Sequence, residues 1–136
     1  MYERALQVES SHPEALLGLG FTLLRADRLE DAMNKAVRLE AALAERPRSN
    51  RFLSRALLLK GRILIREQSR SAAREAVAPL REAVSLPGAP TEAWFFLGES
   101  LAGYNSPEAR TAYLRYLELE PRGHYARVAQ TALGMN

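Results

Sequence analysis

The chain has 136 residues, of which 47% are hydrophobic and 26% are charged, and it contains no cysteine. This composition fits one globular domain and excludes intrinsic disorder, a disulfide framework and thiolate chemistry. The longest apolar run, residues 15–24, is shorter than the roughly 20 residues that span a bilayer, so we expect no membrane insertion. Residues 1–10 lack a basic start followed by an apolar stretch. No targeting segment is therefore recognised, and the compartment, cytoplasmic or periplasmic, stays open.

The charges are distributed unevenly along the chain. Residues 46–81 hold ten Lys or Arg and two acidic residues, a formal charge of +8, whereas the rest holds nine and fourteen, a charge of −5. Seventeen of the nineteen cations are arginine. Arginine suits planar pairing with carboxylate or phosphate, although we favour the base composition of the source as the reason for the excess.

The apolar residues recur at helical spacings and predict an all-α chain. Leu16, Leu19 and Leu23 are three and four residues apart, and no stretch alternates apolar and polar residues long enough to predict a strand. Clusters of Gly, Pro, Asp, Asn or Ser mark the breaks between helices. In chain order we predict a helix within residues 2–9, three helix pairs within 13–46, 50–87 and 91–121, and a last helix within 123–134.

Three of the predicted helix starts carry capping signals. Asp27 precedes Glu30 by three residues, Ser106 stands before Pro107, and Thr91 stands before an acidic residue. Pro79 falls inside a helix predicted over residues 71–86. Because proline removes a helical hydrogen bond, it predicts a kink or a later helix start there.

A repeat is visible in the first helix of each pair. The segments ALLGLG (15–20), ALLLKG (56–61) and AWFFLG (93–98) each end in glycine, and these glycines are 41 and 37 residues apart. We expect the glycines to let neighbouring helices approach closely, because a larger side chain would overpack the contact. The small residues predicted to lie where the paired helix crosses are Ala32, Ala76 and Ala109.

The repeat resembles the tetratricopeptide repeat family, and the third pair carries the resemblance best. Its matching residues are Trp94, Leu97, Gly98 and Leu101 on the first helix and Ala109, Tyr113, Tyr116 and Pro121 on the second. Lys60 departs from the Leu expected before the glycine of the second pair. The resemblance covers residues 2–121 and implies a right-handed α-solenoid of antiparallel helix pairs, a TPR-like superhelix.

The two ends of the chain are interpreted through the same resemblance. Residues 2–9 look like the second helix of an upstream repeat, so we expect the chain to be a piece of a larger, bacterial protein. Residues 123–134 would form a C-terminal capping helix, with apolar residues on one side and polar residues on the other.

The resemblance also implies a function. First helices of this family line a concave groove that holds a partner segment, so it implies a non-catalytic protein-interaction module, a scaffold or adaptor. The expected partner is a protein or peptide segment of acidic character, because the implied groove is apolar with a basic centre. Its main residues would be Leu17, Phe21, Arg25, Arg55, Leu58, Arg62, Arg66, Phe95, Phe96 and Glu99. Further positions carried over are Glu14, Gly18, Leu24, Leu59, Ile65, Glu92 and Ala102.

Several of these positions have a more specific expectation. Spacings of 4, 7 and 4 place Arg51, Arg55, Arg62 and Arg66 in one stripe of a helix, which would either meet an acidic partner or be a solvated face with intramolecular pairs. Trp94 is expected to pack, with Phe95 or Phe96 facing the groove as an anchor. Leu17 and Phe21 stand where chaperone-binding relatives carry Lys and Asn, which disfavours a chaperone-tail adaptor.

Other function classes receive less support from the sequence. His12 and His124 lie in separate predicted turns, and no glycine-rich phosphate loop is present, so we expect no enzyme activity, no cofactor and no metal. Binding of single-stranded RNA through the basic middle repeat stays an alternative. A homodimer through the helix within residues 2–9 is another.

Overall fold

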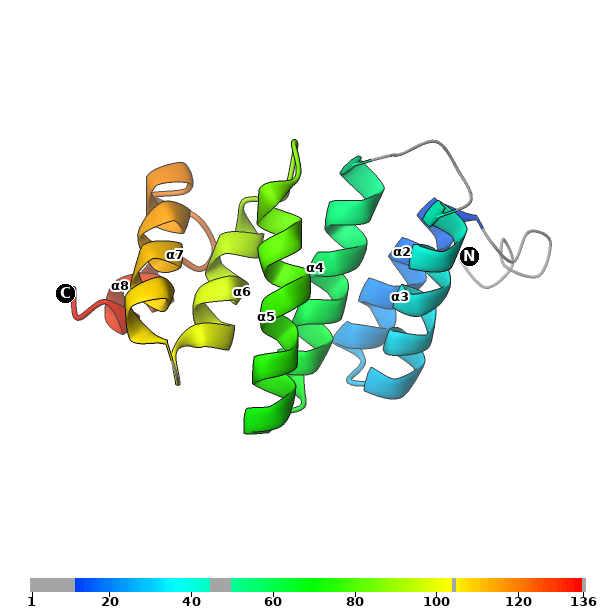
Figure 1. The fold of residues 1–136 in the computed structure, drawn as a ribbon, viewed down its shortest axis with the longest axis horizontal. Helices are drawn as coiled ribbons and strands as arrows, with labels where there is room; N and C mark the ends of the chain where they lie inside the picture. Colours follow the sequence, from blue (N-terminus) through cyan, green and yellow to red (C-terminus); the bar gives the residue numbers. More distant parts are fainter. Residues whose placement is uncertain (1–11, 45–49, 104, 136) are drawn as a thin grey trace.

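The computed structural model describes residues 12–44, 50–103 and 105–135, and within these ranges it consists of helices without a strand (Figure 1). The helices described are α2 (Pro13–Arg25), α3 (Leu29–Ala44), α4 (Asn50–Arg66), α5 (Arg70–Ser85), α6 (Glu92–Leu101), α7 (Ser106–Leu119) and α8 (Ala126–Ala132). The all-α prediction is confirmed for these ranges. The three predicted pairs correspond to α2 with α3, α4 with α5, and α6 with α7, whereas the helix predicted within residues 2–9 lies outside the described residues.

The helix pairs follow one another in a row that runs from α2 and α3 to α7 and α8 (Figure 1). Each described helix packs against the next along the chain, and α4 also packs against both α2 and α6. The first helices of the three pairs therefore share one side of the row. No described helix is long and apolar enough to cross a membrane.

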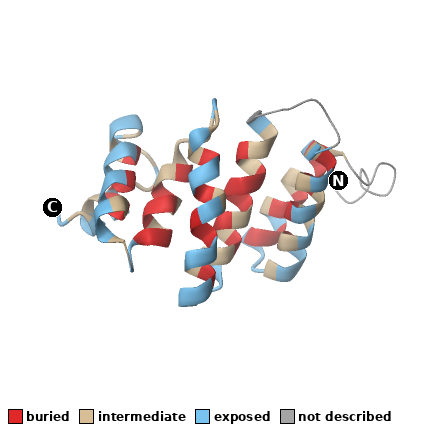
Figure 2. Cartoon of the chain, viewed as in Figure 1, coloured by how far each residue is buried: buried red, intermediate tan, exposed pale blue. Residues whose placement is uncertain are grey.

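The core follows the row instead of forming one centre, because each helix presents an apolar stripe to its neighbours (Figure 2). On α3, for example, Ala32, Ala36 and Leu39 are four and three residues apart, and all three are fully buried. One cluster of buried side chains spans α4 to α8, and two smaller clusters join α2, α3 and α4. Every pair thus depends on its neighbour for burial.

The three repeated glycines lie at close helix contacts, as predicted. A Cβ atom added to Gly20 would come within 2.5 Å of Leu59 Cδ2, and one added to Gly98 would come within 2.9 Å of the Tyr113 ring. Gly61 has equally little room beside Leu80 on α5. The small residues predicted on the second helices are also buried: Ala32, Ala76 and Ala109.

The prediction that Asp27 caps α3 is wrong. Asp27 has a φ of +62°, its N–H donates to the Leu24 carbonyl at 3.0 Å, and the N–H of Arg28 donates to the Leu23 carbonyl at 2.9 Å. This is the hydrogen-bond pattern of a Schellman motif, which ends α2 with a left-handed residue. Because the turn between α2 and α3 is so short, Asp27 serves the end of one helix and cannot also cap the next.

Two other helix starts differ from expectation, and one of the two alternatives for the proline helix is excluded. Asn105, one residue before Ser106, caps α7 by accepting a hydrogen bond from the Glu108 N–H at 3.3 Å. The Thr91 hydroxyl donates to Glu120 Oε1 at 3.2 Å instead of capping α6. Pro79 lies inside α5, which begins at Arg70, so the helix does not start late and the kink stays a prediction.

Candidate functional site

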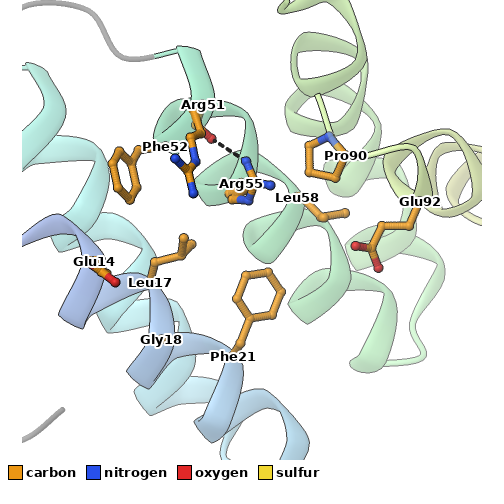
Figure 3. A pocket seen from close by; sticks show the side chains of 10 residues that line it. All are labelled: Glu14, Leu17, Gly18, Phe21, Arg51, Phe52, Arg55, Leu58, Pro90 and Glu92. Atoms are coloured by element: carbon orange, nitrogen blue, oxygen red, sulfur yellow. Dashed lines mark hydrogen bonds between the residues drawn. The ribbon is translucent and has the colours of Figure 1, made fainter. Parts of the chain in front are cut away.

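An open groove of about 420 Å³ lies between α2 and α4, beside the start of α6 (Figure 3). Four of the ten main residues predicted to form a binding groove line it, namely Leu17, Phe21, Arg55 and Leu58. The other lining residues are Glu14, Gly18, Arg51, Phe52, Pro90 and Glu92. The groove is thus lined by segments that are about 30 to 75 residues apart in the sequence.

The floor of this groove is apolar. Leu17 and Phe21 are four residues apart on α2, so they lie on the same helix face, and both side chains point toward α4 in Figure 3. Leu58 of α4 is 2% exposed and closes the floor from the other side, and Phe52 lies near the Arg51 side chain. Leu17, Phe21 and Phe52 are each half-buried, so they leave apolar surface that a ligand can cover.

Two arginines on the α4 wall, Arg51 and Arg55, have no carboxylate partner among the described residues. Arg55 Nη1 donates to the Arg51 carbonyl oxygen at 3.4 Å, and the Arg51 guanidinium lies 5.8 Å from the centre of the Phe52 ring. No carboxylate of the described residues comes within 4.0 Å of either guanidinium, although Glu14 lines the opposite wall. Like charges one helical turn apart repel each other, and no described carboxylate within 4.0 Å compensates the positive charge of this wall.

Arg62, two helical turns after Arg55 on the same face, has its contacts within the molecule. Its guanidinium carbon lies 4.7 Å from the centre of the Phe96 ring and 5.8 Å from that of Phe21, and Arg62 Nη1 lies 3.8 Å from Glu92 Oε2. Cations over aromatic faces are stabilised by the ring quadrupole. Arg62 therefore links α2, α4 and α6, and it does not line the groove.

The other two cations of the prediction lie away from the groove as well. Arg66 Nε lies 3.5 Å from Asp27 Oδ1, an exposed pair between the end of α4 and the turn after α2. Arg25 is exposed in the last turn of α2. The stripe of four arginines is thus divided, with Arg51 and Arg55 facing the groove and Arg62 and Arg66 in intramolecular pairs.

The aromatic residues of α6 are arranged only partly as predicted, because Trp94 packs against the core cluster but Phe95 is the more buried residue. Phe95 is 3% exposed and stacks on Tyr125 with ring centres 4.5 Å apart, whereas Trp94 and Phe96 are half-buried. Phe95 is therefore a core residue and has no surface to offer a partner. Tyr125, in the turn before α8, covers the Phe95 face of α6, and helical periodicity does not predict a contact between such distant segments.

Glu99 is also engaged inside the molecule. It accepts a hydrogen bond from the Tyr113 hydroxyl, which joins α6 to α7. Burial of Tyr113 and this hydrogen bond to a carboxylate raise the pKa of its hydroxyl well above the usual value near 10. Among the further positions, Leu24 and Leu59 are 2% and 0% exposed and belong to the core.

Two lining residues were not predicted, Phe52 and Pro90. Phe52 lies beside the arginine stripe on α4 and outside the repeated motif. Pro90 belongs to the connection between α5 and α6, and only the folding of that connection onto α4 brings it to the groove. Arg51 was recognised as part of the stripe, but its position on the groove wall follows from the structure.

No protein-family model matches the chain, and no curated protein is found to be similar to it. Among the described residues, no group of three or more His, Asp or Glu side chains could hold a metal ion. The function has therefore to be inferred from the geometry and charge of the groove.

Proposed function

We propose that this chain is a protein-interaction module of the tetratricopeptide type, an α-solenoid that binds a segment of a partner protein in the groove between α2 and α4. The observation that carries the proposal is the groove itself. It has an apolar floor, polar residues on its walls and a volume of about 420 Å³. Ligand sites fall in the range of about 300–1,000 Å³ and combine these same features.

The packing of the helices supports the solenoid part of the proposal. Helix pairs follow one another in a row, and α2, α4 and α6 pack together on one side of it. A stack of helix pairs that is closer on one side curves toward that side and presents its first helices on the concave face. The groove lies between two of these first helices, where the resemblance implies a partner segment.

The alternative of RNA binding is disfavoured by the same geometry. A single strand would need a continuous line of cations along its phosphates. Here Arg62 and Arg66, the cations that would extend the Arg51 and Arg55 pair along α4, have the carboxylates of Glu92 and Asp27 within 4.0 Å. Among the described cations of α4, only Arg51 and Arg55 have no carboxylate within 4.0 Å.

A peptide-selection experiment tests the proposal. A random dodecapeptide library would be selected against the wild-type protein, against Leu17→Lys, which places a charge on the groove floor, and against Val37→Lys. Val37 lies on α3 and is 52% exposed, so its variant adds the same charge to an apolar surface position outside the groove. We expect wild type and Val37→Lys to enrich the same peptides and Leu17→Lys to lose them, with equal helicity by circular dichroism.

Two outcomes would contradict the proposal. One is the absence of any enriched peptide with well-folded wild-type protein. The other is retention of the same peptides at the same affinity by Leu17→Lys, which would place binding elsewhere on the surface.

A further inference from the structure

We infer that the segment bound in this groove carries a carboxylate, held by Arg51 and Arg55, next to an apolar side chain that covers Leu17 and Phe21. The inference rests on the proposed function and specifies the chemistry of the partner. It follows from a comparison of the arginines of α4, some of which have a carboxylate nearby among the described residues while others have none.

The first argument is the contrast along one helix face. Arg62 and Arg66 each lie within 4.0 Å of a carboxylate of this chain, whereas Arg51 and Arg55 have none among the described residues. Two of the four arginine charges in the stripe are therefore compensated by carboxylates of the described chain, and the other two are available to a ligand. These other two are the arginines that line the groove.

The second argument is geometric. Arg51 and Arg55 are one helical turn apart on the same wall, and guanidinium groups at that spacing can donate to the two oxygens of one carboxylate. The hydrogen bond from Arg55 to the Arg51 carbonyl uses one Nη1 donor, and the remaining donors of both groups are unused by the described residues. A bound carboxylate would also relieve the repulsion between the two cations.

The third argument concerns the kind of anion. Glu14 lines the opposite wall of the groove and Glu92 lines its far end. Glu92 has Arg62 as its counter-charge, but Glu14 has no cation within 4.0 Å among the described residues. This negative wall tolerates a singly charged carboxylate better than a doubly charged phosphate, so we assign an acidic segment and not a phosphorylated one.

The apolar half of the ligand follows from the floor. Leu17 and Phe21 are half-buried on α2, directly across the groove from the two arginines (Figure 3). A carboxylate on the α4 wall thus places neighbouring side chains of an extended segment over this apolar surface. The expected motif is Asp or Glu within about three residues of a large apolar residue, because extended chains advance about 3.3 Å per residue.

The test uses the peptides enriched from a random dodecapeptide library with free C-termini. Dissociation constants would be measured by fluorescence anisotropy for wild type, for the Arg51→Gln, Arg55→Gln double variant, and for an Arg122→Gln, Arg127→Gln control. The control pair is exposed near the C-terminal end of the row and removes the same net charge. Each peptide would be prepared with its acidic side chain replaced by the amide and, separately, with an amidated C-terminus.

We expect an acidic and apolar motif, an affinity loss of about tenfold or more in the Arg51 and Arg55 variant, and an unchanged affinity in the control. Loss on side-chain amidation would identify an internal Asp or Glu as the source of the carboxylate, and loss on C-terminal amidation would identify the chain end. Enriched peptides without any dependence on a carboxylate, or equal affinity in the double variant, would overturn this inference and leave the proposed function standing. Absence of enriched peptides would overturn both.

Discussion

Lys60 Nζ lies 2.9 Å from Glu40 Oε1, and this ion pair joins α4 to α3. The equivalent positions before the repeated glycine in the other two pairs are Leu19 and Leu97, both buried. Lys60 is less enclosed, with about 30% of its side chain exposed, and the Glu40 oxygen that it meets is buried. A charged residue at this apolar position is thus matched by a carboxylate on the preceding helix.

This pair predicts a measurable coupling energy. In a double-mutant cycle of Lys60→Met and Glu40→Gln, we expect a coupling of about 0.2–1 kcal/mol in the free energy of unfolding, because both side chains keep contact with water. Lys60→Met alone should be less stable than the double variant, since it leaves the buried Glu40 oxygen without a cation. Urea unfolding followed by circular dichroism measures all four proteins. A coupling of zero would show that the pair contributes nothing to stability.

Gly98 is predicted not to tolerate a larger side chain without a loss of stability. Gly98→Ala should lower the free energy of unfolding by about 1–3 kcal/mol, because the added methyl group meets the packed ring of Tyr113. Gly103→Ala is the matched control, since no heavy atom lies within 4 Å of its added Cβ. We expect the control to change stability by no more than about 0.5 kcal/mol. Equal stability of the two variants would contradict the close contact of α6 with α7.

Alanine variants of Phe95 and Phe96 should differ in stability, because Phe95 is buried and Phe96 is only half-buried. Phe95→Ala should cost about 3–5 kcal/mol of stability because it empties the centre of the cluster formed with Tyr113, Tyr116 and Tyr125. Phe96→Ala should cost only about 1 kcal/mol, since its ring is half-buried. Guanidinium unfolding monitored by the fluorescence of the single tryptophan, Trp94, compares them. A larger stability loss for Phe96→Ala than for Phe95→Ala would mean that Phe96 is the residue that α7 and α8 cover.

Arg62 is predicted to stabilise the fold, because its guanidinium lies near the rings of both Phe21 and Phe96. Arg62→Met should lower the free energy of unfolding by about 1–2 kcal/mol, because it removes the cation that faces Phe21 and Phe96 and leaves Glu92 without a partner. Arg66→Met is the control, and its exposed pair with Asp27 should contribute less than about 0.5 kcal/mol. Thermal unfolding at matched ionic strength distinguishes the two. Equal losses would argue that Arg62 is as solvated as Arg66.

The link between α5 and α7 predicts a pH dependence. Arg81 Nε donates to Glu108 Oε2 at 2.8 Å, and its second hydrogen bond goes to the other carboxylate oxygen. The hydrogen bond from Arg81 holds the pKa of the Glu108 carboxyl below its usual value near 4.5. A depressed pKa in the folded state stabilises the fold above the unfolded pKa, and this contribution disappears as the pH falls through the folded value.

The corresponding measurement compares wild type with Glu108→Gln at pH 7, 5 and 3. The stability advantage of wild type should be present at pH 7 and shrink toward pH 3, because the carboxyl takes up a proton in the unfolded state at a higher pH than in the folded state. An advantage that grows on acidification would contradict the assigned direction of the pKa.

The amino-acid sequence by itself determined where the helices of the described chain lie and which glycines allow close contacts. These features depend on local patterns, namely apolar residues at helical spacings and clusters of helix-breaking residues. Even the departures at helix ends are small, since Asn105 caps α7 one residue from the predicted cap.

The tertiary structure decided which side chains remain available to a partner. Arg62 has a carboxylate partner because the fold brings Glu92, about 30 residues after Arg62 in the sequence, beside it. Phe95 is buried in part because Tyr125 stacks on its ring. Sequence periodicity assigns a residue to a face of its own helix, but it does not state which distant helix or loop covers that face. Pairing and burial are properties of two segments in contact, so the groove and its two open arginines became visible only once the helices were placed beside one another.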